Sequence, residues 1–293
     1  MPIVSVIVPT RKRNHLLPRA LESLFAQTLT DFEILLVDDN PVGSRVSHDG
    51  RLQSLLGEPR VRLIEHSHPR NAARARNCGL RQATGEWITY LDDDDAYRPT
   101  KLEKQLRRGL ETDLPLGLCG LISFLAGRAR TRQVGRDLFG REDLLLEAVP
   151  DAKAIFHRRT DCIWFDEMLD ASEDAHFFFQ LVKHFQVDRV FNVPEPLVEV
   201  YPQTGQRVNL NAEGQWMASR AIDRDYACTC EESKRRVFLI RAELRYCKLR
   251  PGHLGRMCQL ARQLLRMRGM REARPILNAF LYKIPLARRF IMS

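Results

Sequence analysis

Short hydrophobic runs alternate with amphipathic segments along the first part of the chain. The runs at residues 3–8, 32–37, 61–64 and 87–91 are rich in β-branched and aromatic residues, which predicts buried strands. Apolar positions at helical spacing predict helices over 16–25 and 72–83, with Gly85 as the C-cap of the second helix. Strands separated by helices of this length predict a parallel sheet with right-handed crossovers.

The same alternation continues to about residue 205. We expect a helix over 101–110, strands over 116–125 and 154–156, a helix over 173–185, and a strand pair over 187–201 that Pro194 and Pro196 interrupt. From about residue 213 to 293, Arg, Leu, Met and Ala recur at helical period and predict several helices. The expected class is therefore α/β, with residues 1–210 as one domain and 211–293 as a basic helical region.

Composition narrows the choice of partner and compartment. The 293 residues carry a formal net charge of +9, which favours polyanions such as nucleotides, nucleic acid or anionic lipid head groups. Seven cysteines at irregular spacing suit free thiols in a reducing compartment, and none forms a zinc-like pattern. We find no secretion signal and no apolar window of the ~18 residues that a membrane span needs. We therefore expect a cytoplasmic protein.

The last segment, residues 275–293, combines apolar positions with Lys283, Arg288 and Arg289. A basic amphipathic segment of this kind can lie on an anionic membrane surface. Its apolar face can equally pack on the main domain, so both interpretations stay open.

Four consecutive aspartates, Asp92 to Asp95, directly follow the apolar run at 87–91. Four like charges repel one another unless a cation or water screens them, and hard divalent cations prefer carboxylate oxygens. The edge where parallel strands end is also where open α/β sheets bind ligands. The run therefore predicts a divalent-metal site, with a solvated acidic turn as the alternative.

Polar clusters follow two further strands. Pro9, Thr10 and Arg11 end the first strand and Asp39 follows the second, so in a parallel sheet all of them reach the edge that holds the aspartates. Basic residues lie in or near the same connections: Arg11, Lys12, Arg13, Arg70, Arg74 and Arg76. Acidic and basic groups together suit a metal-bridged polyanion such as a nucleoside diphosphate. The glycine-rich phosphate loops of P-loop NTPases and dinucleotide dehydrogenases are absent from the sequence.

Four segments in this order, VSVIVPTRKR, FEILLVDDN, ARNCGL and ATGEWITYLDDDD, resemble the N-terminal half of glycosyltransferase family 2. The clearest resemblance covers about residues 3–110, and a weaker one extends it to about 185. It implies the GT-A fold, with a mixed, mostly parallel sheet, a nucleotide-binding part at 1–110 and an acceptor and base part at 111–210. The family is typically inverting. The segment Gln203 to Val208 lacks the Gln-x-x-Arg-Trp pattern of processive members, so we expect transfer of one sugar.

The resemblance also implies roles for individual residues. Asp92 and Asp94 match the outer carboxylates of the Asp-x-Asp motif, which holds Mn²⁺ or Mg²⁺ against the donor diphosphate, and Asp95 would support them. Contacts to the nucleoside are implied for Pro9, Thr10, Arg11, Asp39, Arg76 and Asp93. Each of these also has an explanation in the local hydrogen bonding of strand-end turns. Pro69-Arg70-Asn71 departs from the family's usual Asn-x-Gly, which puts in doubt the local approach of the backbone to the nucleotide.

Asp174, in the Glu173-Asp174 pair, matches the catalytic base of the family. Inverting transfer needs one carboxylate that deprotonates the acceptor hydroxyl during its attack. An acidic pair is also favoured at a helix N-terminus by the helix dipole, and both explanations can hold together.

These inferences predict a metal-dependent transferase that moves a sugar from a nucleotide sugar, with UDP favoured, to a glycan or lipid-linked acceptor. Synthesis of cell-surface polysaccharide, lipopolysaccharide or another glycoconjugate is the expected context, in the cytoplasm or at the inner face of the membrane. The alternatives are a sugar-nucleotide nucleotidyltransferase, a nucleotide-sugar binder without turnover, and a basic nucleic-acid-binding protein with steep salt dependence. The basic residues are spread along the chain and abundant in its last part, so association with a membrane surface or a carrier lipid explains them equally well. We expect no nucleic-acid partner.

Overall fold

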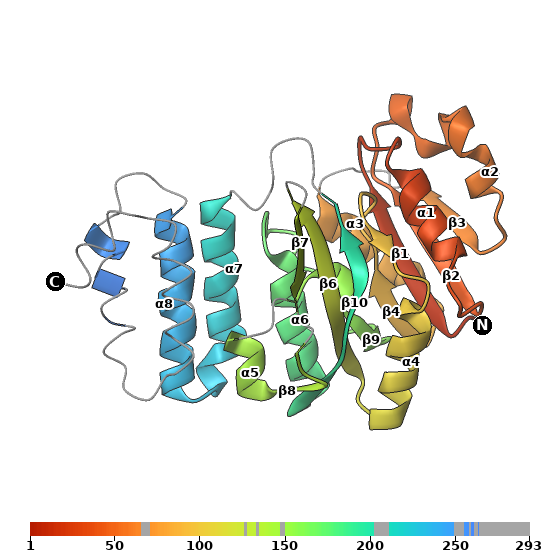
Figure 1. Ribbon diagram of the computed structural model, residues 1–293. Helices are drawn as coiled ribbons and strands as arrows, with labels where there is room; N and C mark the ends of the chain where they lie inside the picture. Colours follow the sequence, from red (N-terminus) through yellow and green to blue (C-terminus); the bar gives the residue numbers. More distant parts are fainter. Residues whose placement is uncertain are drawn as a thin grey trace. The chain divides into compact units, whose positions relative to one another are not determined.

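The computed structural model describes residues 1–65, 71–125, 128–132, 135–146, 150–201, 211–248, 255–257, 259–260 and 263. The chain divides into two compact units, Met1–Leu169 with Glu173–Gly205, and Asp170–Ser172 with Gln206–Ser293. Figure 1 shows the sheet and its helices in the first unit and a helix pair in the second.

The N-terminal half of the first unit is a parallel sheet, as predicted. Four strands lie side by side in the order β3-β2-β1-β4, and every neighbouring pair is parallel. Their bounds are Val4–Thr10 for β1, Phe32–Asp38 for β2, Val61–Glu65 for β3 and Trp87–Tyr90 for β4. Helix α1 (Leu17–Phe25) follows β1, the short α2 (Gln53–Leu56) precedes β3, and α3 (Ala72–Gln82) precedes β4.

The sheet continues beyond β4 through an antiparallel strand. β9 (Phe156–Arg158) lies between β4 and β6 (Leu116–Leu125) and is antiparallel to both. Consequently β6, and β10 (Arg189–Val200) parallel to it, run in the same direction as β1, β2 and β4. Three short strands pair antiparallel with this half: β5 (Ala96–Tyr97), β7 (Arg128–Arg132) and β8 (Leu138–Gly140). The mixed, mostly parallel sheet of the expected fold is confirmed.

Helices complete the first unit. They are α4 (Lys101–Thr112), α5 (Arg141–Leu146) and α6 (Glu173–His184). Aromatic side chains form much of the core next to α6, where the Phe165 and Phe177 rings stack with centroids 3.9 Å apart. α4 contributes an unexpected buried basic group, because Lys101 is fully buried and its Nζ donates to Thr89 Oγ1 over 2.6 Å.

Three local predictions were wrong. Residues 189–200 form one strand, and shifts in its register with β6 around Pro196 absorb the prolines that were expected to divide it. Gly85 is not a helix C-cap: α3 ends at Gln82 with Ala83 as its C-cap, and a Cβ on Gly85 would lie 2.5 Å from Ser5 N, so this glycine allows close approach to β1. The strand predicted at 154–156 begins instead at Phe156, after the 3-10 turn η4 (Ala152–Ala154).

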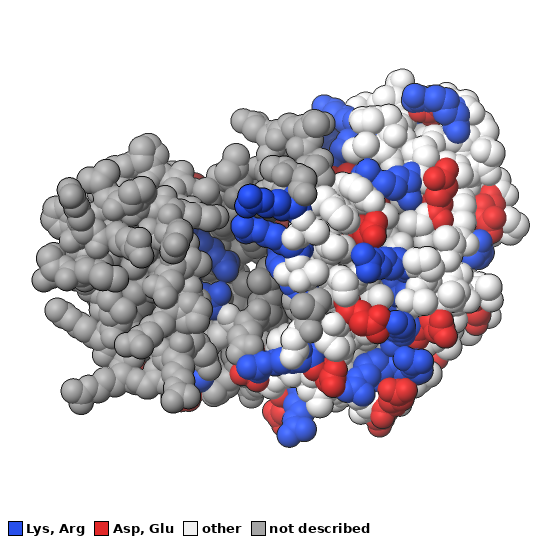
Figure 2. Space-filling view, viewed as in Figure 1, with Lys and Arg blue, Asp and Glu red and all other residues white. Residues whose placement is uncertain are grey.

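Most described residues of the second unit are helical. Helices α7 (Ala212–Asp225) and α8 (Glu232–Lys248) contact each other, and Asn211 caps α7 by accepting from Gly214 N over 2.9 Å. The amphipathic segment at 275–293 lies outside the described residues. None of the described helices combines the length and the apolar character that crossing a bilayer requires. On the face shown in Figure 2, acidic and basic side chains are interspersed over the first unit.

Candidate active site

One edge of the sheet collects the candidate residues, and strand direction explains why. β1, β2 and β4 are parallel and end at this edge. β9 is antiparallel to β4, so the turn η4 ahead of β9 arrives at the same edge. Helix α6 precedes β10, which runs parallel to β6, and this places the start of α6 at the same edge.

The aspartates after β4 form a compact carboxylate cluster. Oxygen atoms of Asp92, Asp94 and Asp95 all lie within 4.8 Å of one another. Asp94 and Asp95 are buried, whereas Asp92 is partly exposed. Clustered carboxylate oxygens are the donor set that Mg²⁺ and Mn²⁺ prefer, so these residues fit a divalent ion. Asp95, expected only to support the ligands, belongs to the cluster.

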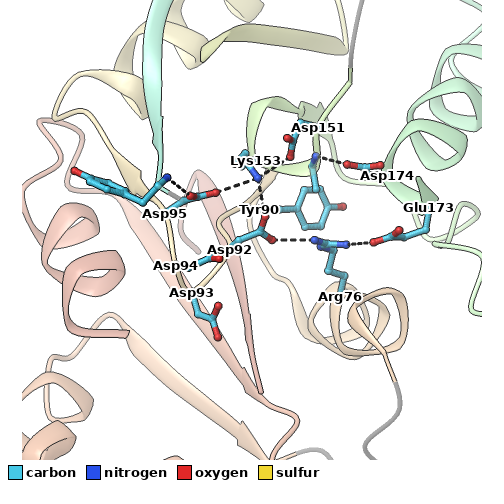
Figure 3. Close-up of polar contacts among 12 residues, drawn as sticks. Arg76, Tyr90, Asp92, Asp93, Asp94, Asp95, Asp151, Lys153, Glu173 and Asp174 are labelled. Atoms are coloured by element: carbon cyan, nitrogen blue, oxygen red, sulfur yellow. Dashed lines mark hydrogen bonds and ion pairs between the residues drawn. The ribbon is translucent and has the colours of Figure 1, made fainter. Parts of the chain in front are cut away.

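Two buried cations pair with this cluster, as Figure 3 shows. Arg76 Nη2 lies 2.9 Å from Asp92 Oδ1, and Lys153 Nζ lies 2.8 Å from Asp92 Oδ2. Burial alone would raise the pKa of Asp92, but Lys153 and Arg76 hold that pKa well below its usual range. Lys153 also pairs with Asp95 and Asp151, and these carboxylates hold its own pKa well above the usual value despite burial.

Asp93 belongs to a different set of contacts. It is fully buried, accepts a hydrogen bond from Thr10 Oγ1 over 2.8 Å, and lies 2.9 Å from Arg13 Nη2. Burial raises the pKa of Asp93 to about 7, in spite of Arg13 and Thr10, which lower it. Arg13 also bonds Asp94 Oδ2 over 2.9 Å and so joins the end of β1 to the acidic run.

The structure brings the other predicted nucleoside contacts together at the ends of β1 and β2. Asp39 N donates to Thr10 O over 2.9 Å, and Arg11 Nη1 lies 3.7 Å from Asp39 Oδ2. Asp39 is buried, whereas Arg11 is about two-fifths exposed. Pro9 is partly buried and lies within β1, opposite Val37 of β2.

Asp174, the predicted base, lies at the start of α6. Its Oδ1 accepts from Ala175 N over 2.8 Å and its Oδ2 accepts from Ala152 N over 3.3 Å. Burial, followed by repulsion from Glu173 and Asp151, raises the pKa of Asp174 to about 7. The neighbouring Glu173 Oε1 accepts from Arg76 Nη1 over 2.8 Å. Arg76 therefore connects the acidic run to the helix that carries Asp174.

Three residues at this edge had no predicted role of their own: Arg13, Lys153 and Arg19. Arg19 donates to the carbonyl of Asp94 and stacks on the Tyr201 ring, with its guanidinium 3.8 Å from the ring centroid. Tyr201 N in turn donates to Asp95 Oδ1 over 3.0 Å. Arg13 stood out in the sequence only as one basic residue among several. Two expectations, for Arg70 and for the segment Gln203 to Val208, lie outside the described residues.

Known proteins similar to this chain are glycosyltransferases. Residues 5–136 match the family described as glycosyl transferase family 2. An Escherichia coli protein, UDP-Glc:alpha-D-GlcNAc-diphosphoundecaprenol beta-1,3-glucosyltransferase WfgD, is 31% identical over 113 residues, which make up 38% of this chain and 43% of that protein. Across three curated relatives, the matched part spans 34%, 43% and 54% of the relative's length. The chain thus corresponds to about a third to a half of each.

Solved structures resemble the chain over almost its whole length. S. aureus TarS 1-349, solved in complex with UDP-GlcNAc, has a TM-score of 0.66 at 18% identity and covers 99% of this chain and 90% of its own. The mannosyltransferase PcManGT from Pyrobaculum calidifontis, solved with GDP-Man and Mn²⁺, has a TM-score of 0.61 at 18% identity, with coverages of 99% and 83%. At these identities the likeness shows the fold. Residues 5–136 therefore form a glycosyl transferase family 2 domain, and the chain has the expected GT-A fold.

Proposed function

We propose that this glycosyltransferase moves one sugar from a nucleotide-diphosphate sugar, with UDP favoured, to a hydroxyl of a glycan or lipid-linked acceptor, with inversion at the anomeric carbon. The observation that carries the proposal is the bridge from Asp92 through Arg76 to Glu173, beside Asp174. It ties a carboxylate cluster suited to a metal-diphosphate group to a carboxylate suited to proton abstraction.

The donor is assigned to the ends of β1, β2 and β4. Thr10, Arg11, Asp39 and Asp93 form the nucleoside side of the site, and Asp92 with Asp94 would hold Mn²⁺ or Mg²⁺ next to the diphosphate. A bound divalent ion supplies positive charge that offsets the charge of the departing diphosphate. The Mn²⁺ complex of PcManGT supports the metal, and the UDP-GlcNAc complex of TarS supports UDP.

Asp174 is assigned as the base that accepts the proton of the acceptor hydroxyl. A carboxyl with a pKa raised to about 7 is a stronger base than an ordinary aspartate and is still largely ionised slightly above neutral pH. Inverting transfer, typical of the family that the sequence resembles, needs one such base to deprotonate the acceptor hydroxyl.

The acceptor class comes from a relative, since WfgD is named for a diphosphoundecaprenol acceptor. A lipid-linked acceptor would bring the protein to the inner face of the membrane. The basic segment at 275–293 is the proposed contact with that surface, through its positive charges and apolar positions. Cell-surface polysaccharide or glycoconjugate synthesis is the corresponding pathway context.

Two substitutions separate the binding step from the chemical step. Asp94→Ala should remove Mn²⁺-dependent binding of UDP, because the carboxylate cluster loses one ligand. Asp174→Asn should retain that binding and lose transfer. Asp161→Asn, at a side chain that is 80% exposed, serves as the control and should change neither property.

Binding is measured by thermal shift with UDP, GDP and nucleotide sugars, with and without Mn²⁺, because a ligand stabilises the folded state by mass action. Transfer is measured as UDP release with lipid-linked and glycan acceptors. Sugar transfer by the Asp174→Asn protein at the parental rate would overturn the assignment of the base. If the parental protein binds a nucleotide sugar but transfers sugar to none of the acceptors, the result would favour a nucleotide-sugar binder without turnover.

A further inference from the structure

Lys153 occupies the carboxylate cluster in an unusual way. Its ammonium lies 2.8 Å from Asp92 Oδ2, 3.0 Å from Asp95 Oδ2 and 2.9 Å from Asp151 Oδ1, and the residue is 7% exposed. Figure 3 shows the ammonium between these three carboxylates. Two of the three, Asp92 and Asp95, are among the residues that could hold a metal ion. The Lys153 ammonium and a divalent metal ion would therefore both bind carboxylate oxygens of Asp92 and Asp95.

The backbone fixes Lys153 in this position. Ala154 N donates to Asp151 O over 2.8 Å, which closes the turn η4, and Ala152 N donates to Asp174 Oδ2. Antiparallel pairing of β9 with β4 then holds this turn beside the acidic run. The ammonium thus belongs to the architecture of the edge, unlike an exposed lysine that meets an aspartate by chance.

Electrostatics makes the two cations competitors. A divalent ion bound to Asp92 and Asp95 would lie a few ångströms from the ammonium, and like charges at such separations repel strongly where water is largely excluded. The ammonium also has a partner outside the metal cluster. Asp151 lies directly before the turn η4 that carries Lys153, and it does not belong to the cluster that could hold the metal. Lys153 can leave Asp92 and Asp95 and remain paired.

We propose that Lys153 is a resident cation of the acidic run, that it competes with the divalent ion for Asp92 and Asp95, and that it thereby weakens metal binding by the protein without its donor. This inference rests on the proposed function, since it takes the acidic run to be the metal site. Lys153 is a positioning residue in this scheme: it sets how readily the carboxylates accept the ion.

A purely structural lysine makes a different prediction. If Lys153 only neutralised buried carboxylates, its loss would lower the stability of the protein and leave metal affinity unchanged or reduced. Competition requires that metal affinity rise when the ammonium is removed. Metal affinity without nucleotide therefore separates the two roles, and it needs no catalytic assay.

The experiment titrates the full chain with Mn²⁺ alone and measures affinity by calorimetry. Lys153→Met removes the charge and keeps an unbranched side chain, Lys153→Arg keeps the charge, and Lys104→Met is a matched control in α4, where Lys104 pairs with Glu195. We expect Lys153→Met to bind Mn²⁺ about tenfold more tightly or better, and the other two variants to bind like the parent. Mn²⁺ should also raise the melting temperature of Lys153→Met more than that of the parent, because the ion replaces a missing buried countercharge.

Each alternative outcome is informative. Parental Mn²⁺ binding with equal or weaker binding by Lys153→Met would overturn the competition and leave the proposed function intact. No Mn²⁺ binding by either protein would overturn both this inference and the metal requirement of the proposed function. Should Lys153→Met fail to fold, Asp151→Asn tests the same competition. Without its second partner the ammonium should hold Asp92 and Asp95 more firmly, so Mn²⁺ affinity should fall several-fold, and an affinity equal to that of Asp161→Asn would overturn the inference.

Discussion

Arg76 Nη1 and Glu173 Oε1 lie 2.8 Å apart, and the other terminal nitrogen of the same guanidinium contacts Asp92. One side chain from α3 therefore neutralises one carboxylate of the acidic run and one at the start of α6. Arg76 is 5% exposed, so it compensates the charge of Glu173 in a region with little water and shares the compensation of Asp92 with Lys153.

Arg76→Met should be strongly destabilising, because it leaves Glu173 without its buried partner and Asp92 with Lys153 alone. A loss of about 3–5 kcal/mol in the free energy of unfolding is expected for breaking such a pair. Arg76→Lys should lose less, although one ammonium cannot reproduce the two-pronged contact. Urea denaturation measures the effect, with Arg107→Met as the control, since Arg107 is largely exposed and pairs with the exposed Glu111. Equal stability of Arg76→Met and the control would show that the bridge has little energetic weight.

Asp174 should impose a pH dependence on transfer. Because burial and two neighbouring carboxylates raise its pKa to about 7, kcat/KM should rise with pH through about 7 and then level off as the base becomes ionised. Glu173→Gln removes a repelling charge and should move this midpoint to lower pH. The measurement is a pH-rate profile of both proteins. A midpoint near 4 in the parent would contradict the assigned environment of Asp174.

The same pKa predicts a stability effect of Asp174→Asn. A carboxyl whose pKa is raised by folding binds its proton more tightly in the folded state, so the stability it contributes is lost as pH rises through about 7. The asparagine variant carries no such charge. It should therefore be more stable than the parent at pH 8, with the difference disappearing near pH 4. Thermal unfolding at the two pH values tests this. An equal change in melting temperature at both pH values would point to altered packing.

Lys101 predicts an opposite trend with pH. Burial lowers the pKa of its ammonium to about 7, so between about pH 7 and 10.5 the unfolded state binds the proton and the folded state does not. Burial of the charged ammonium therefore lowers the free energy of unfolding most at pH 7 and below. Lys101→Met should be more stable than the parent at pH 6.5, and this advantage should shrink by pH 9.5. Urea denaturation at both values measures it, and Lys104→Met in the same helix is the control.

Gly117 of β6 should not accept a side chain. A Cβ at this position would lie 2.1 Å from a carbon of the Phe191 ring, which is fully buried and meets the Trp87 ring edge-on at 6.5 Å. The ring has little room to move, so Gly117→Ala should cost roughly 1–3 kcal/mol or more through overpacking. Gly43→Ala, where nothing lies within 4 Å, should be nearly neutral. Similar urea midpoints for both variants would contradict the close packing of β6 and β10.

Local sequence patterns predicted the first four strands closely because each is a short apolar run flanked by turn residues. The convergence of Thr10, Asp39 and the aspartates followed from parallel strand direction alone. Lys153 could not be predicted in the same way, since its place depends on an antiparallel strand inserted between β4 and β6, and pairing between distant segments leaves no local periodicity. The prediction that Pro194 and Pro196 divide this strand was wrong for a related reason, because pairing of β10 with β6 continues past them with a shifted register.

The insertion of β9 has an evolutionary consequence. Because the turn ahead of β9 delivers position 153 to the carboxylates independently of α3, the amino acid there can change while every strand of β3-β2-β1-β4 keeps its sequence. Under the competition proposed for Lys153, a lysine, a neutral residue or an acid at this one place would give descendants of the same scaffold different affinity for a divalent ion. Divergence in ion affinity could thus proceed through single substitutions, without rebuilding the ends of β1 and β2 that are proposed to hold the nucleoside.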